Sequence, residues 1–194
     1  MDPSTHAFAE RREATTYTML QRVLQNHCTT HALSLLAALT AAVLLLVGTC
    51  LQLCEAGGVE EGTLLWQTLA GLKQRMRTRP VRVPLPLLAA PDDADPQDPR
   101  VRHQTEALSR ALATLLSDAE EAHQLSREGS WRIAGALVAD LLGLWLPPGD
   151  LPGGVVDAVM DHLGRAVAVQ IARARGHRLT EASVHRRTAA RGKA

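Results

Sequence analysis

The stretch "HALSLLAALTAAVLLLVGTCLQL", residues 31–53, contains no Asp, Glu, Lys or Arg, although charged residues are common elsewhere in the chain. A helix rises about 1.5 Å per residue, so a helix of this length crosses roughly 30 Å of hydrocarbon. It also satisfies its own backbone hydrogen bonds within lipid. The stretch therefore predicts an N-terminal transmembrane helix at residues 31–53. The alternatives are a buried core helix and a signal peptide, although a signal peptide has a shorter apolar run of about 7–15 residues.

The charges around this stretch predict its orientation. Arg11, Arg12 and Arg22 precede it, whereas the first charged residues that follow it are acidic, beginning with Glu55. The positive-inside rule then places the N-terminus in the cytoplasm and the rest of the chain on the opposite side. The sequence thus predicts a single-pass membrane protein of type II topology.

Small and sulfur-containing residues lie in and beside the same stretch. Cys28 and Cys54 stand at its boundaries, where thiols are open to acylation, although cysteines there also serve as small apolar fillers. Ser34, Ala38 and Ala42 recur every four residues, a spacing that lets two membrane helices approach closely. We therefore consider a homodimer through this stripe, although alanine is abundant enough for chance to produce it.

The remaining periodicity is helical throughout, and the fold class that it predicts is all-α: a small helical bundle with a central apolar helix, in addition to the transmembrane helix. A short helix is expected at residues 13–26. Composition divides the chain into the following segments: a cytoplasmic N-terminal segment (1–30), the transmembrane helix (31–53), a membrane-proximal helix (54–79), a Pro-rich linker (80–100), the helical bundle (101–180) and a basic tail (181–194).

Three helices are expected within the bundle. Gly129 is predicted to end the first. Ser130 is predicted to cap the second, which is apolar nearly all round and ends at Pro147 and Pro148. The third carries an apolar face from Val156 onward. The second helix is therefore expected to be the buried centre of the bundle.

Three regions of the sequence resemble the homology regions of the Bcl family of apoptosis regulators. "SWRIAGALV" is similar to the family's first homology region, with Trp131, Arg132 and Gly135 at the matching positions. "DAVMDHLGRAV" running into "RARGH" is similar to the second region, and "TLAGLKQRM", with Leu69 and Gly71, to the third.

This resemblance implies a groove between helices that receives the apolar face of a partner helix. In such a groove Arg132 would pair with an acidic residue of the partner, beside Trp131 and Gly135. The floor would be formed by Leu112, Leu115, Leu116 and Val138. The alternative is that Arg132 is a solvated first-turn residue and that the apolar residues are ordinary core.

The sequence offers no recognisable catalytic or metal-binding constellation. His162, beside Asp161, lacks a partner nucleophile or a ligand spacing, so no enzyme activity, cofactor or metal is expected. A net charge of +1 argues against binding to nucleic acid through bulk charge. We therefore expect a membrane-anchored protein that binds other proteins through amphipathic helices, with a Bcl-like apoptosis regulator as the specific form. A type II membrane scaffold or accessory subunit unrelated to apoptosis is the alternative.

Overall fold

The computed structural model describes residues 3–57, 61–78, 98–122, 124–145, 157–173 and 176. Within these residues the chain forms helices and the turns between them, which confirms the all-α prediction. A further helical segment covers residues 157–173. The labelled helices are α1 (Pro3–His31), α2 (Leu35–Gly57), α3 (Glu61–Thr78), α4 (Pro99–Glu121) and α5 (Arg127–Trp145).

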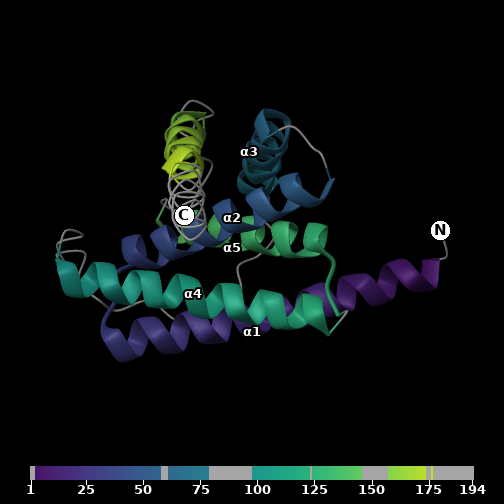
Figure 1. Ribbon diagram of the computed structural model, residues 1–194, viewed down its shortest axis with the longest axis horizontal. Coiled ribbons are helices and arrows are strands. Elements are labelled where there is room, and N and C mark those ends of the chain that lie inside the picture. The colour runs from purple at the N-terminus through teal and green to yellow at the C-terminus, as the bar shows by residue number, and fades with distance from the viewer. Residues whose placement is uncertain are drawn as a thin grey trace, which may run out of the picture.

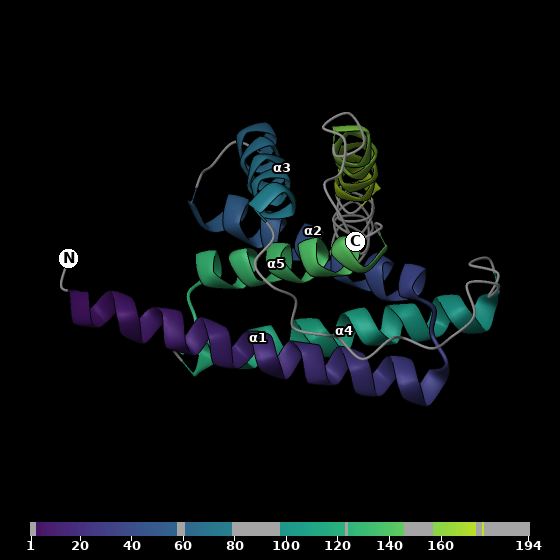
Figure 2. The ribbon, with the colours of Figure 1, turned by 180° about the vertical axis from the view of Figure 1, so that it is seen from behind.

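The helices are arranged in three layers. Helices α1 and α4 lie along each other in one outer layer, and α2 and α5 lie against them in the middle (Figures 1 and 2). Helix α3 and residues 157–173 stand on the other side of α2 and α5, where both are seen nearly end-on. The middle layer is thus the one that is shielded from water on both sides.

A sharp turn separates α1 from α2. Helix α1 ends at His31, Ala32 adopts a positive φ of 50°, and the hydroxyl of Ser34 accepts a hydrogen bond of 3.2 Å from the backbone N–H of Ala37. Ser34 therefore caps α2 at its N-terminus. The apolar helix begins and ends four residues later than the predicted span of 31–53, because the first residues of that span form this turn.

Helix α1 is part of the bundle rather than a separate segment. It has 29 residues, about twice the length expected for residues 13–26. Leu20, Leu24 and Cys28 recur every four residues along it, and all three are buried. The hydroxyl of Tyr17 donates to Asp140 of α5, and a ring nitrogen of His27 donates to the backbone carbonyl oxygen of Gln104 at 3.1 Å.

Helix α2 is packed inside the bundle, where it contacts α3, α4 and α5. Ala38, Ala41, Ala42 and Leu46 have no exposed surface, and the small alanines let neighbouring helices approach closely. Of the described helices, α2 alone is long and apolar enough to cross a membrane, while 56 % of its most apolar stretch is buried within the fold. Length and composition therefore suit both a membrane and a protein core.

The junction of α4 and α5 differs from the prediction. Helix α4 ends at Glu121 rather than at Gly129, and α5 starts at Arg127. The hydroxyl of Ser126, not that of Ser130, caps α5, since it accepts a hydrogen bond of 3.0 Å from the N–H of Gly129. Ser130 lies within the helix and donates its hydroxyl proton to Glu120. Gly129 thus belongs to the first turn of α5.

Helix α4 begins at Pro99, inside the predicted linker of 80–100, because Asp98 caps it. The Asp98 carboxylate accepts a hydrogen bond of 2.8 Å from the N–H of Arg100, and Pro99 suits the first helical position. The predicted basic tail of 181–194 and most of the linker lie outside the described residues, as do Pro147 and Pro148.

We expect Leu46→Ala to lower the free energy of unfolding by about 2–5 kcal/mol, because it leaves a cavity at a fully buried position of α2. Chemical denaturation followed by circular dichroism measures the change. Leu36→Ala is the matched control on the same helix, since 42 % of the Leu36 side chain is exposed. Equal effects of the two substitutions would contradict the packing of α2 in the core.

Candidate functional site

The residues expected to form the floor of a partner-binding groove lie in the core. Leu112, Leu116 and Val138 are buried, and Leu115 is partly buried against them. Leu112 and Leu116 stand one turn apart on the face of α4 that packs inward, together with Leu108. In this structure these side chains are ordinary core, which was the alternative that the sequence left open.

The other predicted partner-binding residues come together at a hollow between α3 and α5. Trp131, Arg132 and Gly135 of α5 line it, and its volume is about 240 Å³. The opposite wall belongs to α3 and consists of Gln67, Thr68, Gly71 and Leu72. We call this site the α3–α5 hollow.

A hydrogen bond fixes the tryptophan at the wall of the α3–α5 hollow. The indole N–H of Trp131 donates to the hydroxyl oxygen of Thr68 at 2.9 Å. Thr68 in turn donates to the backbone carbonyl oxygen of Leu64 at 2.8 Å, and the Cys50 sulfur lies 3.9 Å from its hydroxyl. This buried network sets the distance between α3 and α5, and hence the shape of the hollow.

Both glycines of the hollow face open space. A Cβ atom built on Gly71 or on Gly135 would have no heavy atom within 4 Å outside its own helix and chain neighbours. These are the small residues that the Bcl resemblance singles out on α3 and α5. Larger side chains at these positions would therefore fill the hollow without disturbing the surrounding packing.

Arg132 is both exposed and paired. Its guanidinium donates to Glu13 of α1 at 2.5 Å and to Glu128, one turn earlier in α5, at 2.9 Å. The pKa of Arg132 is raised, mainly by the hydrogen bond to Glu13. Burial lowers this pKa, whereas the negative charges of Glu13 and Glu128 raise it further. Arg132 thus ties α1 to α5 at the rim of the hollow, and a partner carboxylate would compete with Glu13 for it.

Trp66 is the residue that the sequence analysis missed. It lies on α3, on the side of the helix that faces away from the hollow-lining residues Gln67 and Gly71, and it is 70 % exposed. An exposed tryptophan is unusual on a free surface and common at the centre of protein interfaces. The sequence did contain one signal for an exposed Trp66: it lies next to the apolar face of α3, and the nearby positions 67, 70 and 71 are polar or small.

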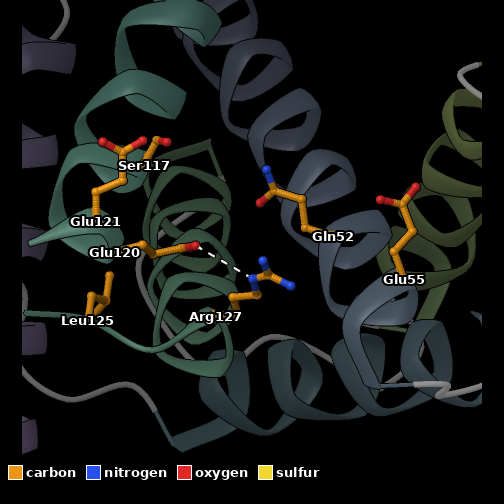
Figure 3. A pocket seen from close by; sticks show the side chains of 7 residues that line it. All are labelled: Gln52, Glu55, Ser117, Glu120, Glu121, Leu125 and Arg127. Atoms are coloured by element: carbon orange, nitrogen blue, oxygen red, sulfur yellow. Dashed lines mark ion pairs between the residues drawn. The ribbon is translucent and has the colours of Figure 1, made fainter. Parts of the chain in front are cut away.

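A second, polar hollow of about 410 Å³ lies where α2, α4 and α5 meet. Figure 3 shows Glu120 and Arg127 directed toward one another across it, with the Arg127 Nε 4.0 Å from a carboxylate oxygen. Gln52 and Glu55 of α2 face the hollow from the other side, and Ser117 and Glu121 lie above the pair. Within the part of the chain that the structure describes, no group of His, Cys, Asp and Glu side chains is arranged to hold a metal ion. The site is a water-accessible ion pair.

An apolar groove lies between α2, the end of α5 and residues 157–173. Its volume is about 760 Å³, and we call it the α2 groove. Its walls include Leu39 and Val43 of α2, Leu142 of α5, and Val159 and Leu163. His162 also lines it and is exposed.

The small-residue stripe considered for a homodimer is buried, as is one of the two cysteines considered for acylation. Ser34, Ala38 and Ala42 are covered by the bundle itself, so a homodimer through them would require the bundle to open. Cys28 is only 2 % exposed, and burial raises the pKa of its thiol to about 12. Cys54 is half-buried in the last turns of α2 and is therefore the more accessible acylation position of the two.

Comparisons with models of known protein families, with curated proteins and with solved structures find no match to this chain.

We expect iodoacetamide at pH 8 to label Cys54 in the native protein well before Cys28. The thiolate is the reactive form, and the raised pKa keeps the Cys28 thiol protonated until the pH approaches about 12. Mass spectrometry of the labelled chain measures the order. All three cysteines should react together in denaturant, and rapid native labelling of Cys28 would show that α1 is not packed as described.

Proposed function

We propose that the chain is a helical protein-interaction protein that binds a partner helix over the α3–α5 hollow. The observation that carries this proposal is the pair of open glycines, Gly71 and Gly135, which face the same hollow beside the partly buried Trp131. Glycines without neighbours allow the backbone of a second helix to come close. The aromatic ring of Trp131 in the wall of the hollow offers such a helix a large apolar surface.

The charge at the rim indicates the chemistry of the partner. Arg132 presents a guanidinium that is already shared between Glu13 and Glu128. A partner carboxylate that replaced Glu13 would form a charge-assisted hydrogen bond in a partly desolvated place, where such bonds are strong. The partner is therefore an amphipathic helix with one acidic residue next to its apolar face.

A Bcl-like regulator of apoptosis is the specific form of this proposal. What supports it is the placement of the resembling residues: Leu69 and Gly71 lie on α3, Trp131, Arg132 and Gly135 lie on α5, and the two helices are in contact. The fold alone does not define the activity, so binding of the partner has to be measured.

A membrane-anchored scaffold or accessory subunit unrelated to apoptosis is the second candidate. The observation that favours it is the length and apolar composition of α2, which has no charged residue between Leu35 and Cys54. In that arrangement α2 would span the membrane once, and the basic residues before it would keep the N-terminus in the cytoplasm.

We expect Gly135→Leu and Gly71→Leu to weaken binding of an amphipathic pro-apoptotic helical peptide to the full chain by at least about tenfold, or about 1.4 kcal/mol. Each leucine fills the hollow, while the open space around the glycine leaves the fold intact. Fluorescence polarisation of a panel of labelled peptides measures the affinity, and circular dichroism verifies the fold.

Gly48→Leu is the matched control, since Gly48 is an equally open helical glycine on α2, away from the hollow. A wild-type chain that is folded and ignores every peptide would overturn the Bcl-like form. Peptide binding that all three variants retain would place the partner elsewhere.

The substitution Gly48→Lys separates the two candidate functions. In the bundle, Gly48 is exposed with open space around it, so lysine is tolerated and improves helix propensity by up to about 1 kcal/mol. Near the centre of a membrane helix, lysine costs about 2.5–3.5 kcal/mol. We expect the variant to unfold at the same denaturant concentration as the wild type or at a higher one, and both chains to be released from membranes by alkaline carbonate.

Gly48→Leu is again the control for this experiment. The membrane anchor would be established if the wild type and Gly48→Leu stayed in the membrane during carbonate extraction while Gly48→Lys was released.

A further inference from the structure

The α2 groove is an apolar site that no part of the proposed function uses. It shares no lining residue with the α3–α5 hollow. Two of the most exposed apolar side chains of the described residues lie at or beside it: Leu36, which is 42 % exposed, and Val169, which is 49 % exposed. The hydroxyl of Thr40, one of its few polar groups, is satisfied by the backbone carbonyl oxygen of Leu36 at 2.8 Å. The other polar side chains of the lining are those of His162 and Gln170, and the remaining lining residues are apolar.

The groove continues at one end into a polar hollow. Leu36, Thr40, Leu44 and Gln170 line both the groove and an adjoining hollow of about 330 Å³. The adjoining hollow also contains Arg102, Glu106 and Arg173. Arg102 pairs with Glu106 at 3.1 Å, and these two charges cancel. The charge of Arg173 then makes this end of the site positive. The connected site is thus apolar along its length and cationic at one end.

The dimensions favour a narrow ligand. A volume of about 760 Å³ lies in the range of small-molecule pockets, about 300–1,000 Å³. An α-helix with its side chains is about 10–12 Å wide, so the same volume would hold fewer than about two turns. A single extended hydrocarbon chain fits such a groove along its length, and its polar head would then reach the cationic end.

We propose that the α2 groove binds a free single-chain anionic amphiphile, such as a long-chain fatty acid. The hydrocarbon chain lies against Leu39, Val43 and Leu163, and the carboxylate lies beside Arg173. Removal of the chain from water supplies most of the affinity, and the guanidinium selects an anionic head.

The test uses the full chain with dodecanoate and dodecyltrimethylammonium, each below its micelle concentration, in isothermal titration calorimetry. We expect dodecanoate to bind at least about tenfold more tightly than the cationic amphiphile, and Arg173→Glu to remove that preference. Ala158→Trp should weaken the binding of dodecanoate at least about tenfold, because Ala158 lines the groove and is exposed enough to accept the larger side chain. Ala168→Trp, an exposed position of the same helical segment that does not line the groove, is the matched control.

Three results would overturn the proposal. Equal affinity of the two amphiphiles would show that the cationic end does not select the head. Equal effects of the two tryptophans would show that the amphiphile lies elsewhere. Binding to vesicles that contain anionic phospholipid, without binding to monomeric dodecanoate, would assign the surface to a membrane instead. Circular dichroism at each amphiphile concentration verifies that the helices persist.

Discussion

The rest of the structure depends on one constraint, which is that α2 must be kept out of water. Its charge-free length exposes so much apolar surface that only lipid or other helices can cover it. In this fold the cover comes from α4 and α5 and, in part, from α3. The alanines of α2 are essential to this packing, because their small side chains let the covering helices lie close enough to exclude water.

The same constraint explains where the hollows occur. Helices α1 and α4 run along one side of the middle layer, whereas α3 and residues 157–173 lie across the other side, where both are seen nearly end-on (Figures 1 and 2). A helix that crosses a layer contacts it over a shorter length than a helix that runs along it. The α3–α5 hollow and the α2 groove are both found where this second layer meets the middle one.

Polar contacts then hold the outer helices in place. Glu13 of α1 accepts a hydrogen bond from Arg132 of α5, and Tyr17 of α1 donates one to Asp140 of α5. The hydroxyl of Thr68 in α3 accepts a hydrogen bond from the indole N–H of Trp131. Lys73 of α3 pairs with Asp157, and the side chain of Leu69 lies against Gly164. Exposed ion pairs contribute little stability, so their main effect is to set the register between helices that apolar packing has already brought together. A partner that competed for Arg132 would therefore act on the contact between α1 and α5.

The sequence by itself determined the helical class and the apolar character of residues 31–53, because periodicity and composition are local properties. Trp131, Arg132 and Gly135 were grouped by the resemblance to the Bcl family. It did not determine the turn at Ala32, the full length of α1 or the cap at Ser126, since element boundaries depend on which polar groups find partners in the folded chain. Only the tertiary structure decided that Leu112, Leu116 and Val138 are core, and that Gly71 and Gly135 face the same hollow. A helical pattern shows which residues share a face, but what covers that face depends on contacts between residues that are far apart in the chain.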